Sequence, residues 1–380
     1  MRNTLILFDG VRIRKGRSYF KVDIVNKKKF GAVLILILLV LGVGAAANFF
    51  GVQKVLTDKK SIGLDETGKI KSVNLSLDYL ISETLQTVKE LDLNAVNVPV
   101  QIDVIGVNDS SMTINRASET KAIEMVQQLE SRHIKVILEP FPYIKMGEVP
   151  ETEWLPADQE QWFDNWQKIL DELIDKLANP DGVYAFYIGS NFEKMEQNSR
   201  WAELIEHVRQ KYKGKITYRT NWWSTAAWDE GENSYQEKLN NPLFGKLDFI
   251  SVAAYFELTE QNKNTVDELV DALHSSRVYG RHQNIAGELR EMAKRWNKPF
   301  FFGELGFPCT EKAAFQPWNP APSFVEDGQE QANCFAAYQR VFADDSWNMG
   351  FSVFAVGSKY GDKPYYPSAQ SIEIIKRWYE

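Results

Sequence analysis

The stretch that decides the fold is PFFFGELGF, residues 299–307, an apolar run that ends in one carboxylate, Glu304, between two glycines. A continuous apolar run indicates a strand buried on both faces, as parallel sheets require. Ligands bind where such strands reach their carboxyl ends. The stretch therefore predicts a functional role for Glu304, with a carboxylate held in a local salt bridge as the alternative.

Similar runs recur along the rest of the chain and alternate with amphipathic stretches. The strand-like runs are residues 70–75, 95–100, 135–140, 184–189, 215–221, 248–256, 299–306 and 350–356. The helix-like stretches include residues 80–91, 119–132, 161–177, 200–212, 286–296, 329–342 and 368–378. Eight strands alternating with helices predict an α/β fold, a (β/α)₈ TIM barrel.

The first 69 residues have a different character from the barrel. Residues 31–50 contain no charged side chain and are rich in Leu, Ile, Val and Ala, which predicts one N-terminal transmembrane helix. The net charge is +7 before this span and −14 after it. The positive-inside rule therefore predicts a single-pass cell-membrane protein with a cytoplasmic N-terminus and an extracellular barrel.

Four segments follow from this interpretation: a cytoplasmic basic segment at 1–30, the transmembrane helix at 31–50, a linker at 51–69 and the barrel at 70–380. Residues 11–25 alternate apolar and basic side chains, a pattern of either a short hairpin or a segment on the inner leaflet. Residues 45–47 are three alanines and resemble a leader cleavage site, but the long basic region before the span favours an uncleaved anchor.

Composition excludes several classes of function. The acidic outer part argues against a nucleic-acid partner. The four histidines lack metal-ligand spacing, and no cofactor-binding motif or nucleophile elbow is present, so neither a metal nor a cofactor is expected. Cys309 and Cys334 lie on the side where disulfides persist, and their spacing leaves a bridge between them open.

The predicted strand ends carry aromatic, carboxylate and amide side chains, which converge on one face of a barrel. Sugars need this combination, because their apolar ring faces stack on aromatic rings while their hydroxyls bond to polar groups. We therefore expect an oligosaccharide or polysaccharide partner. The predicted substrate-binding residues are Glu139, Asn191, Asn221, Trp222, Trp223, Tyr255 and Trp318.

These segments resemble glycoside hydrolase family 113, the β-mannanase-type (β/α)₈ enzymes of the large retaining clan A. The resemblance spans most of residues 62–379. It is carried by NAVNV at 94–98, IKVILEP at 134–140, FYIG at 186–189, TYRTNW at 217–222, DFISVAAYF at 248–256 and GELG at 303–306.

The resemblance implies a retaining mechanism with two carboxyl groups about 5 Å apart. Glu304 falls on the family's nucleophile position. Asn191 stands where the family's acid/base glutamate is expected, and an amide cannot donate and recover a proton at neutral pH. Glu193 shares a face with Asn191 in an extended chain and is the predicted displaced acid/base. Phe354-Ala355 on the eighth strand stands where the family usually has the tryptophan that forms the floor of the first sugar subsite.

Two functions remain open at this point. The first is a membrane-anchored, extracellular retaining glycosidase or transglycosylase that acts on a cell-surface or extracellular polysaccharide through Glu304 and Glu193. The second is a catalytically inactive barrel that binds a cell-wall glycan or supports assembly of a surface polysaccharide. The amide at position 191 favours the second function, whereas Glu304 favours the first.

Overall fold

The computed structural model describes residues 68–226, 228, 231–357 and 362–380, together with three short strands before residue 25. The chain divides into two compact units, residues 1–61 and 62–380. The predicted transmembrane helix at 31–50 lies outside the described residues. Among the helices that are described, none combines the length and the apolar character needed to cross a bilayer.

The first unit contains an antiparallel sheet with the strand order β1-β2-β3. Its strands are β1 (Leu5–Phe8), β2 (Val11–Lys15) and β3 (Phe20–Ile24). β2 and β3 pair with Ile13 opposite Val22. Of the two alternatives for residues 11–25, the structure has the hairpin.

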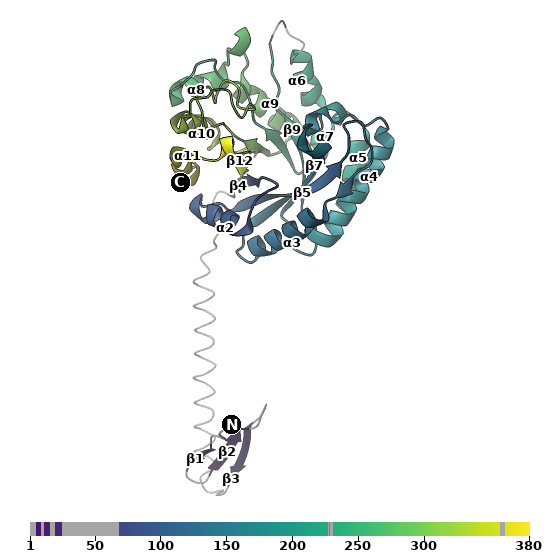
Figure 1. The fold of residues 1–380 in the computed structure, drawn as a ribbon, viewed down its shortest axis with the longest axis vertical. Helices are drawn as coiled ribbons and strands as arrows, with labels where there is room; N and C mark the ends of the chain where they lie inside the picture. Colours follow the sequence, from purple (N-terminus) through teal and green to yellow (C-terminus); the bar gives the residue numbers. More distant parts are fainter. Residues whose placement is uncertain are drawn as a thin grey trace. The chain divides into compact units, whose positions relative to one another are not determined.

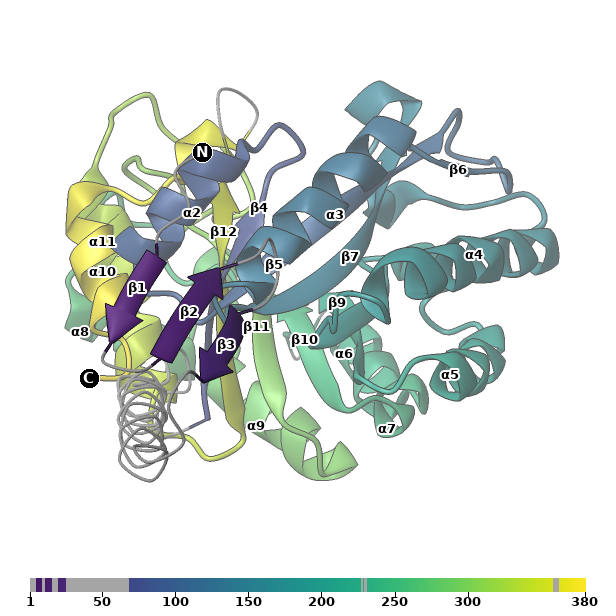
Figure 2. The same cartoon turned by 90° about the horizontal axis from the view of Figure 1, so that it is seen from below.

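The second unit is the predicted TIM barrel (Figures 1 and 2). Its eight parallel strands run in the order β4-β12-β11-β10-β9-β8-β7-β5, and β4 also pairs with β5, which closes the barrel. They are β4 (Ile70–Leu75), β5 (Ala95–Val104), β7 (Lys135–Ile144), β8 (Ala185–Ser190), β9 (Lys215–Asn221), β10 (Phe249–Ala253), β11 (Phe300–Leu305) and β12 (Asn348–Val356). The short β6 (Thr113–Ile114) pairs antiparallel with β5.

Helices surround the strands in Figure 2. They are α2 (Ile81–Glu90), α3 (Arg116–Glu130), α4 (Gln159–Leu173), α5 (Arg200–Lys211), α6 (Gly231–Asn240), α7 (Leu243–Lys246), α8 (Val266–His274), α9 (Ile285–Trp296), α10 (Gly328–Phe342) and α11 (Ala369–Lys376). Shorter helical turns are η2 (Lys145–Gly147), η3 (Glu151–Glu153), η4 (Ile174–Ala178), η5 (Glu193–Met195), η6 (Val278–Gly280) and η7 (Lys363–Tyr365).

Three of these helices are absent from the sequence prediction. α6 begins in an acidic stretch that suggests a solvated loop, and α7 is too short to show a helical period. α8 has a detectable signal, a capping box in which Thr265 and Glu268 bond reciprocally. Side-chain caps also start α3 at Asn115 and α10 at Asp327.

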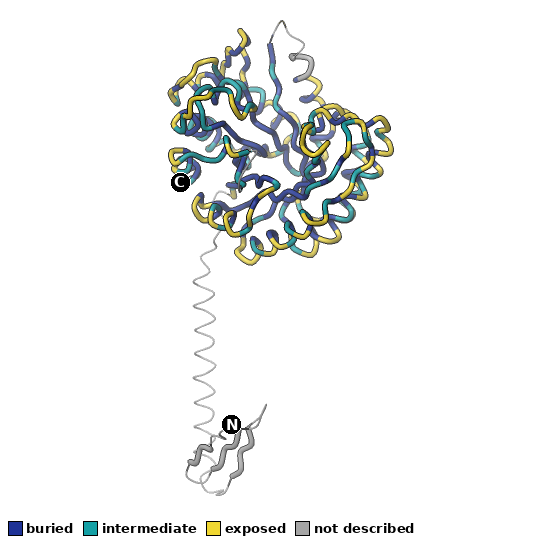
Figure 3. The backbone as a smooth tube through the Cα atoms, in the orientation of Figure 1, coloured by how far each residue is buried: buried dark blue, intermediate teal, exposed yellow. Residues whose placement is uncertain are grey.

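Burial follows the two layers, with buried strands and helices exposed on their outer sides (Figure 3). The bottom of the barrel is filled by apolar side chains that point inward from six strands, namely Ile70, Ala95, Ile137, Ala185, Tyr187, Phe249 and Phe301. An aromatic group fills the space outside β8, where Trp162 stacks on Trp166 and Phe192 stacks on Trp201. Both Cys309 and Cys334 are free thiols, so they form no disulfide in this structure.

Gly303 lets the inward side chains of Ser251, Tyr187 and Arg219 approach β11. A Cβ atom at this position would lie 1.9 Å from the hydroxyl oxygen of Ser251 and 2.6 Å from that of Tyr187. These two hydroxyls bond to each other at 2.9 Å. The barrel interior above Phe301 therefore has no room for a side chain at position 303.

We expect Gly303→Ala to lower the free energy of unfolding by about 1–3 kcal/mol, because the added methyl group overpacks a rigid core. The measurement is the midpoint of urea unfolding followed by far-UV circular dichroism. Gly106→Ala is the matched control, since its Cβ would meet the nearest atom at an ordinary 3.4 Å. Equal midpoints for the two variants would contradict the packing argument.

Candidate active site

A network of polar side chains fills the barrel above its apolar bottom layer. Arg219 on β9 is 1 % exposed and bonds to both carboxylate oxygens of Glu139 on β7, with Nη1 to Oε2 at 3.0 Å. The same Glu139 oxygen accepts a bond of 2.7 Å from Asn97 on β5. Asn97 also bonds to Asn74 on β4, which donates to the carbonyl of Gly303 at 2.9 Å. Five strands are thus tied together.

Glu304 is the second carboxylate held by Arg219. Its Oε1 lies 2.6 Å from Nη2 of Arg219, and the hydroxyl of Tyr255 bonds to the same carboxyl group. Burial raises the pKa of Glu304 to about 7; the Arg219 charge opposes this rise, and the charges of Glu139 and Glu151 add to it. The pKa of Glu304 is thus shifted toward neutral pH, and carboxyl groups perturbed in this way are common at functional sites.

Asn191 follows β8, the neighbour of β9 in the barrel. Its backbone N–H donates to the carbonyl of Arg219 at 2.7 Å, and its φ of 56° lies in the left-handed region that asparagine tolerates better than most residues. Its side-chain Nδ2 donates to Oε1 of Glu151 at 2.9 Å. The buried Oδ1 of Asn191 has no hydrogen-bond partner among the described residues.

A cavity of about 490 Å³ opens at the carboxyl ends of β4, β7 and β12. Three aromatic rings line it, those of Phe141, Tyr143 and Phe354, together with the carboxyl groups of Asp78, Glu151 and Asp362. Its volume is in the range of small-ligand sites, and its mixture of rings and carboxyl groups suits a sugar.

Glu304 connects to this cavity through an aromatic cluster. The ring of Tyr255 lies 5.9 Å from that of Phe354, and Trp222 packs edge-on against Tyr255 at 5.5 Å. Tyr365 completes the cluster, 5.2 Å from Phe354. Burial and the Glu304 charge raise the pKa of Tyr255 well above its usual value, so its hydroxyl stays protonated and can donate to the carboxylate.

The structure thus brings most of the predicted site residues together. Glu304, Glu139, Asn191, Trp222 and Tyr255 belong to the network or the aromatic cluster. Asn221 is buried at the end of β9, in register with Ala253. Residues 358–361, which follow β12, lie outside the described residues.

Three predicted residues have other surroundings. Glu193 is exposed and lies 3.9 Å from Lys238 on α6, which bonds to Thr220. Because Thr220 and Arg219 are consecutive strand residues, their side chains point to opposite sides of β9. Lys238 therefore lies on the side of β9 that faces the helices.

The two predicted tryptophans outside the network contact other groups. Trp223 stacks on Tyr235, and its ring N–H donates to Glu288 of α9 at 2.8 Å. Trp318 is 43 % exposed and donates to Glu257 at 3.3 Å.

Sequence reasoning missed Arg219, Glu151 and Asp362. Arg219 had a detectable signal, because a charged residue on the inward face of a buried strand requires a buried partner. Glu151 and Asp362 lie in loops that give no periodic pattern. Within the described ranges, no group of three or more His, Cys, Asp or Glu side chains is arranged to hold a metal ion.

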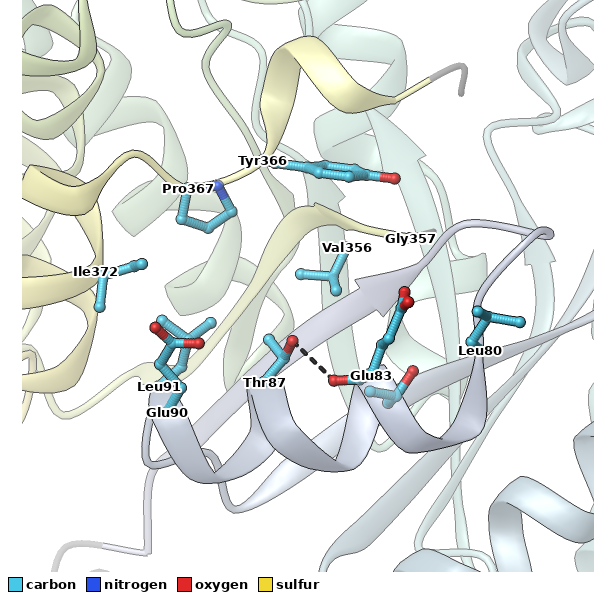
Figure 4. Close-up of a pocket in the computed structure, with 11 residues that line it drawn as sticks. Leu80, Glu83, Thr87, Glu90, Leu91, Val356, Gly357, Tyr366, Pro367 and Ile372 are labelled. Carbon is cyan, nitrogen blue, oxygen red and sulfur yellow. Dashed lines mark hydrogen bonds between the residues drawn. The ribbon is translucent and has the colours of Figure 1, made fainter. Parts of the chain in front are cut away.

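Two further cavities lie away from this network. One, of about 200 Å³, lies between α2 and the segment that leads into α11, with Leu80, Leu91, Tyr366 and Ile372 in its walls (Figure 4). Thr87 in that wall bonds to the carbonyl of Glu83 within its own helix. The other, of about 440 Å³, lies between the loop after β10 and α8, with Leu258, Glu268 and Arg277 in its walls. Neither contains a member of the Arg219 network.

A parallel barrel with an arginine-bound carboxylate at a strand end, beside an aromatic cavity, suits a glycosidase-like protein. The chain belongs to Glycoside Hydrolase Family 113, whose family model matches residues 71–363. This finding confirms the resemblance drawn from the sequence. A comparison with curated protein sequences gave no match.

Solved structures agree in fold. A Glycoside Hydrolase Family 113 β-1,4-mannanase has 20 % identity and a TM-score of 0.63, covering 82 % of this chain and 98 % of its own. The β-mannanase of Alicyclobacillus acidocaldarius in complex with ManMIm has 18 % identity and a TM-score of 0.63, covering 82 % and 97 %. A β-glucuronidase of Ruminococcus gnavus has 15 % identity and a TM-score of 0.55, covering 82 % of this chain and 50 % of its own.

Arg219→Met should destabilise the fold strongly, because it leaves Glu139 and Glu304 buried without their shared cation. Removing one partner of a buried ion pair costs about 3–5 kcal/mol. Chemical unfolding at pH 8 measures the loss. Arg340→Met is the control, since its contact with Asp267 is solvent-exposed and should contribute little. A similar small loss for both variants would show that the buried network is not a stabilising element.

Stability should also depend on pH through Glu304. Its pKa is raised in the folded state, so the folded protein binds more protons than the unfolded chain between about pH 4.5 and 7, and this contribution to stability falls as pH rises. Replacing the group by Gln removes that dependence. Between pH 5 and pH 8, Glu304→Gln should gain about 2–3 kcal/mol relative to wild type.

The measurement is urea unfolding of both proteins at the two pH values. Glu203→Gln removes an exposed carboxylate on α5 and serves as the control. A stability difference between wild type and Glu304→Gln that is the same at both pH values would rule out a raised pKa of Glu304.

Proposed function

We propose that this protein is a retaining glycosidase or transglycosylase in which Glu304 is the nucleophile. One observation carries the proposal: Glu304 lies near the carboxyl end of β11, where Arg219 and Tyr255 both bond to its carboxyl group. Arg219 favours the ionised form, and Tyr255 fixes the direction of the carboxyl group. A buried, oriented carboxylate beside a ring-lined cavity is the arrangement that nucleophilic attack on a sugar requires.

The reaction would run in two steps. Glu304 attacks the anomeric carbon while the glycosidic bond breaks, which forms a glycosyl-enzyme ester. Water then attacks the same carbon and releases Glu304, or a sugar hydroxyl does so and gives transglycosylation. Glu139 bonds to Arg219, Asn97 bonds to Glu139, and Asn74 bonds to Asn97, so this chain of contacts holds the arginine in position.

The substrate class that we propose is a β-linked polysaccharide at the cell surface or outside the cell. Two of the similar structures are described as β-mannanases, one of them specifically as a β-1,4-mannanase, and the cavity offers rings and carboxyl groups rather than cations. Phe354 supplies the ring at the position where the family usually has tryptophan. The smaller phenyl ring offers less stacking area, so the sugar placement differs from that of a typical family member.

Anchoring by residues 31–50, with the N-terminus in the cytoplasm, is part of the same proposal. It is supported by the uncharged span and by the change from +7 before it to −14 after it. An enzyme that edits the envelope of its own cell gains from being tethered. The test is protease treatment of intact cells, which should digest the barrel and leave an N-terminal tag protected.

Activated aryl glycosides test the nucleophile directly. Because a 2,4-dinitrophenolate leaving group needs no acid, wild type should release a burst of it from one member of a panel of β-mannoside, β-glucoside, β-galactoside and β-glucuronide. Glu304→Gln should release none above background. The burst is measured by stopped-flow absorbance. A wild-type trace that equals the Glu304→Gln trace on every sugar would reject the proposed chemistry.

The same substrate should show a simple pH profile. The nucleophile must be ionised, so kcat/KM should rise with pH through about 7, the pKa of Glu304, and then stay level because no acid is needed. A rate that is flat between pH 5 and pH 8 would mean that another group supplies the nucleophile.

A second function, glycan binding without hydrolysis, is favoured by the placement of two residues. Asn191 occupies the expected acid/base position, and Glu193 contacts Lys238 rather than the Arg219 network. If the barrel only binds, Phe354→Ala should weaken β-1,4-oligosaccharide binding about tenfold in calorimetry, since one stacked ring is lost. Phe324→Ala, at a fully exposed ring, is the control. Undiminished binding by Phe354→Ala would place the glycan elsewhere.

A further inference from the structure

Glu151 presents a carboxyl group at the place where the family's acid/base is missing. It opens η3, in the loop after β7, and its Oε1 accepts the 2.9 Å bond from the side chain of Asn191. The carboxyl group is therefore within one hydrogen bond of the position that the family fills with a glutamate. Glu151 also lines the 490 Å³ cavity and is only partly buried, so a ligand in the cavity can reach it.

The loop that carries Glu151 is held in place by Trp154. This side chain is fully buried, and its ring N–H donates to the carbonyl of Asp109 at 3.0 Å. Its ring packs edge-on against Phe192, the residue after Asn191, at 5.7 Å. The contact fixes the loop after β7 to the loop after β8. A carboxyl group held this way keeps a constant position, which proton transfer requires.

The electrostatics distinguish Glu151 from Glu304. The charge of Glu151 is one of the causes that raise the pKa of Glu304, so the two carboxyl groups interact. Burial also raises the pKa of Glu151, whereas the nearby Arg219 lowers it and Glu139 raises it. The direct partner of Glu151 is a neutral amide, but that of Glu304 is the guanidinium of Arg219. This asymmetry favours Glu304 as the ionised member and Glu151 as the protonated member.

We propose that Glu151 is the acid/base of this chain, and the inference rests on the proposed glycosidase function. In the first step the carboxyl proton of Glu151 moves to the glycosidic oxygen as its bond to the anomeric carbon breaks and Glu304 bonds to that carbon. In the second step Glu151 takes a proton from water as the water oxygen bonds to the anomeric carbon and the bond to Glu304 breaks. Atoms, protons and charge balance over the cycle.

Other carboxyl groups fit this role less well. Glu193 contacts Lys238 on the helix side of β9. Glu139 is fully engaged, with two bonds from Arg219 and one from Asn97. Asp362 lines the cavity but accepts a 2.6 Å bond from Ser76, on the β4 side of the cavity. Glu151 alone among these four combines a cavity position with a bond to Asn191.

The test compares substrates with good and poor leaving groups in the full-length chain, purified in detergent. On the best sugar of the aryl panel, Glu151→Gln should lower kcat/KM for the phenyl glycoside by about 10²–10⁴-fold, because only this substrate needs an acid. The release of dinitrophenolate in the first turnover should change by less than about threefold. Glutamine keeps the size and the acceptor oxygen for Asn191, so folding is preserved, and the thermal midpoint checks this.

Two further readouts support the assignment. Sodium azide, which needs no base, should speed turnover of the dinitrophenyl glycoside by Glu151→Gln and give the β-glycosyl azide. Wild type should show a bell-shaped pH profile with the phenyl glycoside, and the variant should lose its alkaline limb. Glu153→Gln, at an exposed carboxylate on the same turn that lies 3.8 Å from Lys194, is the control and should behave like wild type.

Each contrary outcome has a distinct meaning. If Glu304→Gln abolishes both activities but Glu151→Gln changes both substrates equally, or neither, then Glu151 is not the acid/base. If Glu193→Gln or Asp362→Asn shows the leaving-group dependence instead, the role belongs to that residue and the assignment is overturned. If wild type and Glu304→Gln are equally inactive on all substrates, the proposed function itself fails.

Discussion

The barrel depends on one buried arginine, Arg219, whose guanidinium bonds to the carboxylates of both Glu139 and Glu304. A buried carboxylate is tolerated only when a cation or hydrogen-bond donors compensate for lost hydration. One arginine here serves two carboxylates from two other strands. Asn97 supplies a further donor to Glu139 and Tyr255 one to Glu304, while Gly303 leaves the space that the network occupies. The polar layer of the barrel is therefore a single unit rather than a set of independent residues.

The same network gives Glu304 its chemical character. Because two carboxylates and one arginine are buried together, the full charge on both acids is costly, so the pKa of Glu304 is raised to about 7. A further carboxylate in direct contact would raise it more. In the proposed mechanism, the amide at position 191 holds Glu151 in place and separates its carboxyl group from the network by one hydrogen bond. The proposed acid/base therefore lies in the loop after β7 rather than in the loop after β8.

The strands were predictable because each begins with a largely apolar run that alternates with an amphipathic stretch. Seven of the eight begin within one residue of the predicted position, and β12 begins two residues earlier than expected. Helices α6, α7 and α8 were not predicted. α6 starts in an acidic stretch, α7 is a single turn, and α8 is recognisable only by its capping box.

Within the site, Glu304 and Tyr255 were predicted from strand ends. Glu193 was chosen on the assumption that the chain stays extended after β8, whereas Asn191 turns into the left-handed region and η5 follows.

The sequence by itself determined the barrel, the position of Glu304 at the end of its strand and the family, because each depends on local patterns of apolar and polar residues. Only the tertiary structure decided which carboxyl groups interact. The bond between Glu151 and Asn191 joins residues 40 positions apart, and the pair of Arg219 with Glu139 joins residues 80 apart. Such contacts depend on barrel closure and on the path of the loops, and loop paths are set by side-chain packing such as that of Trp154 on Phe192. No periodic signal in the chain encodes them.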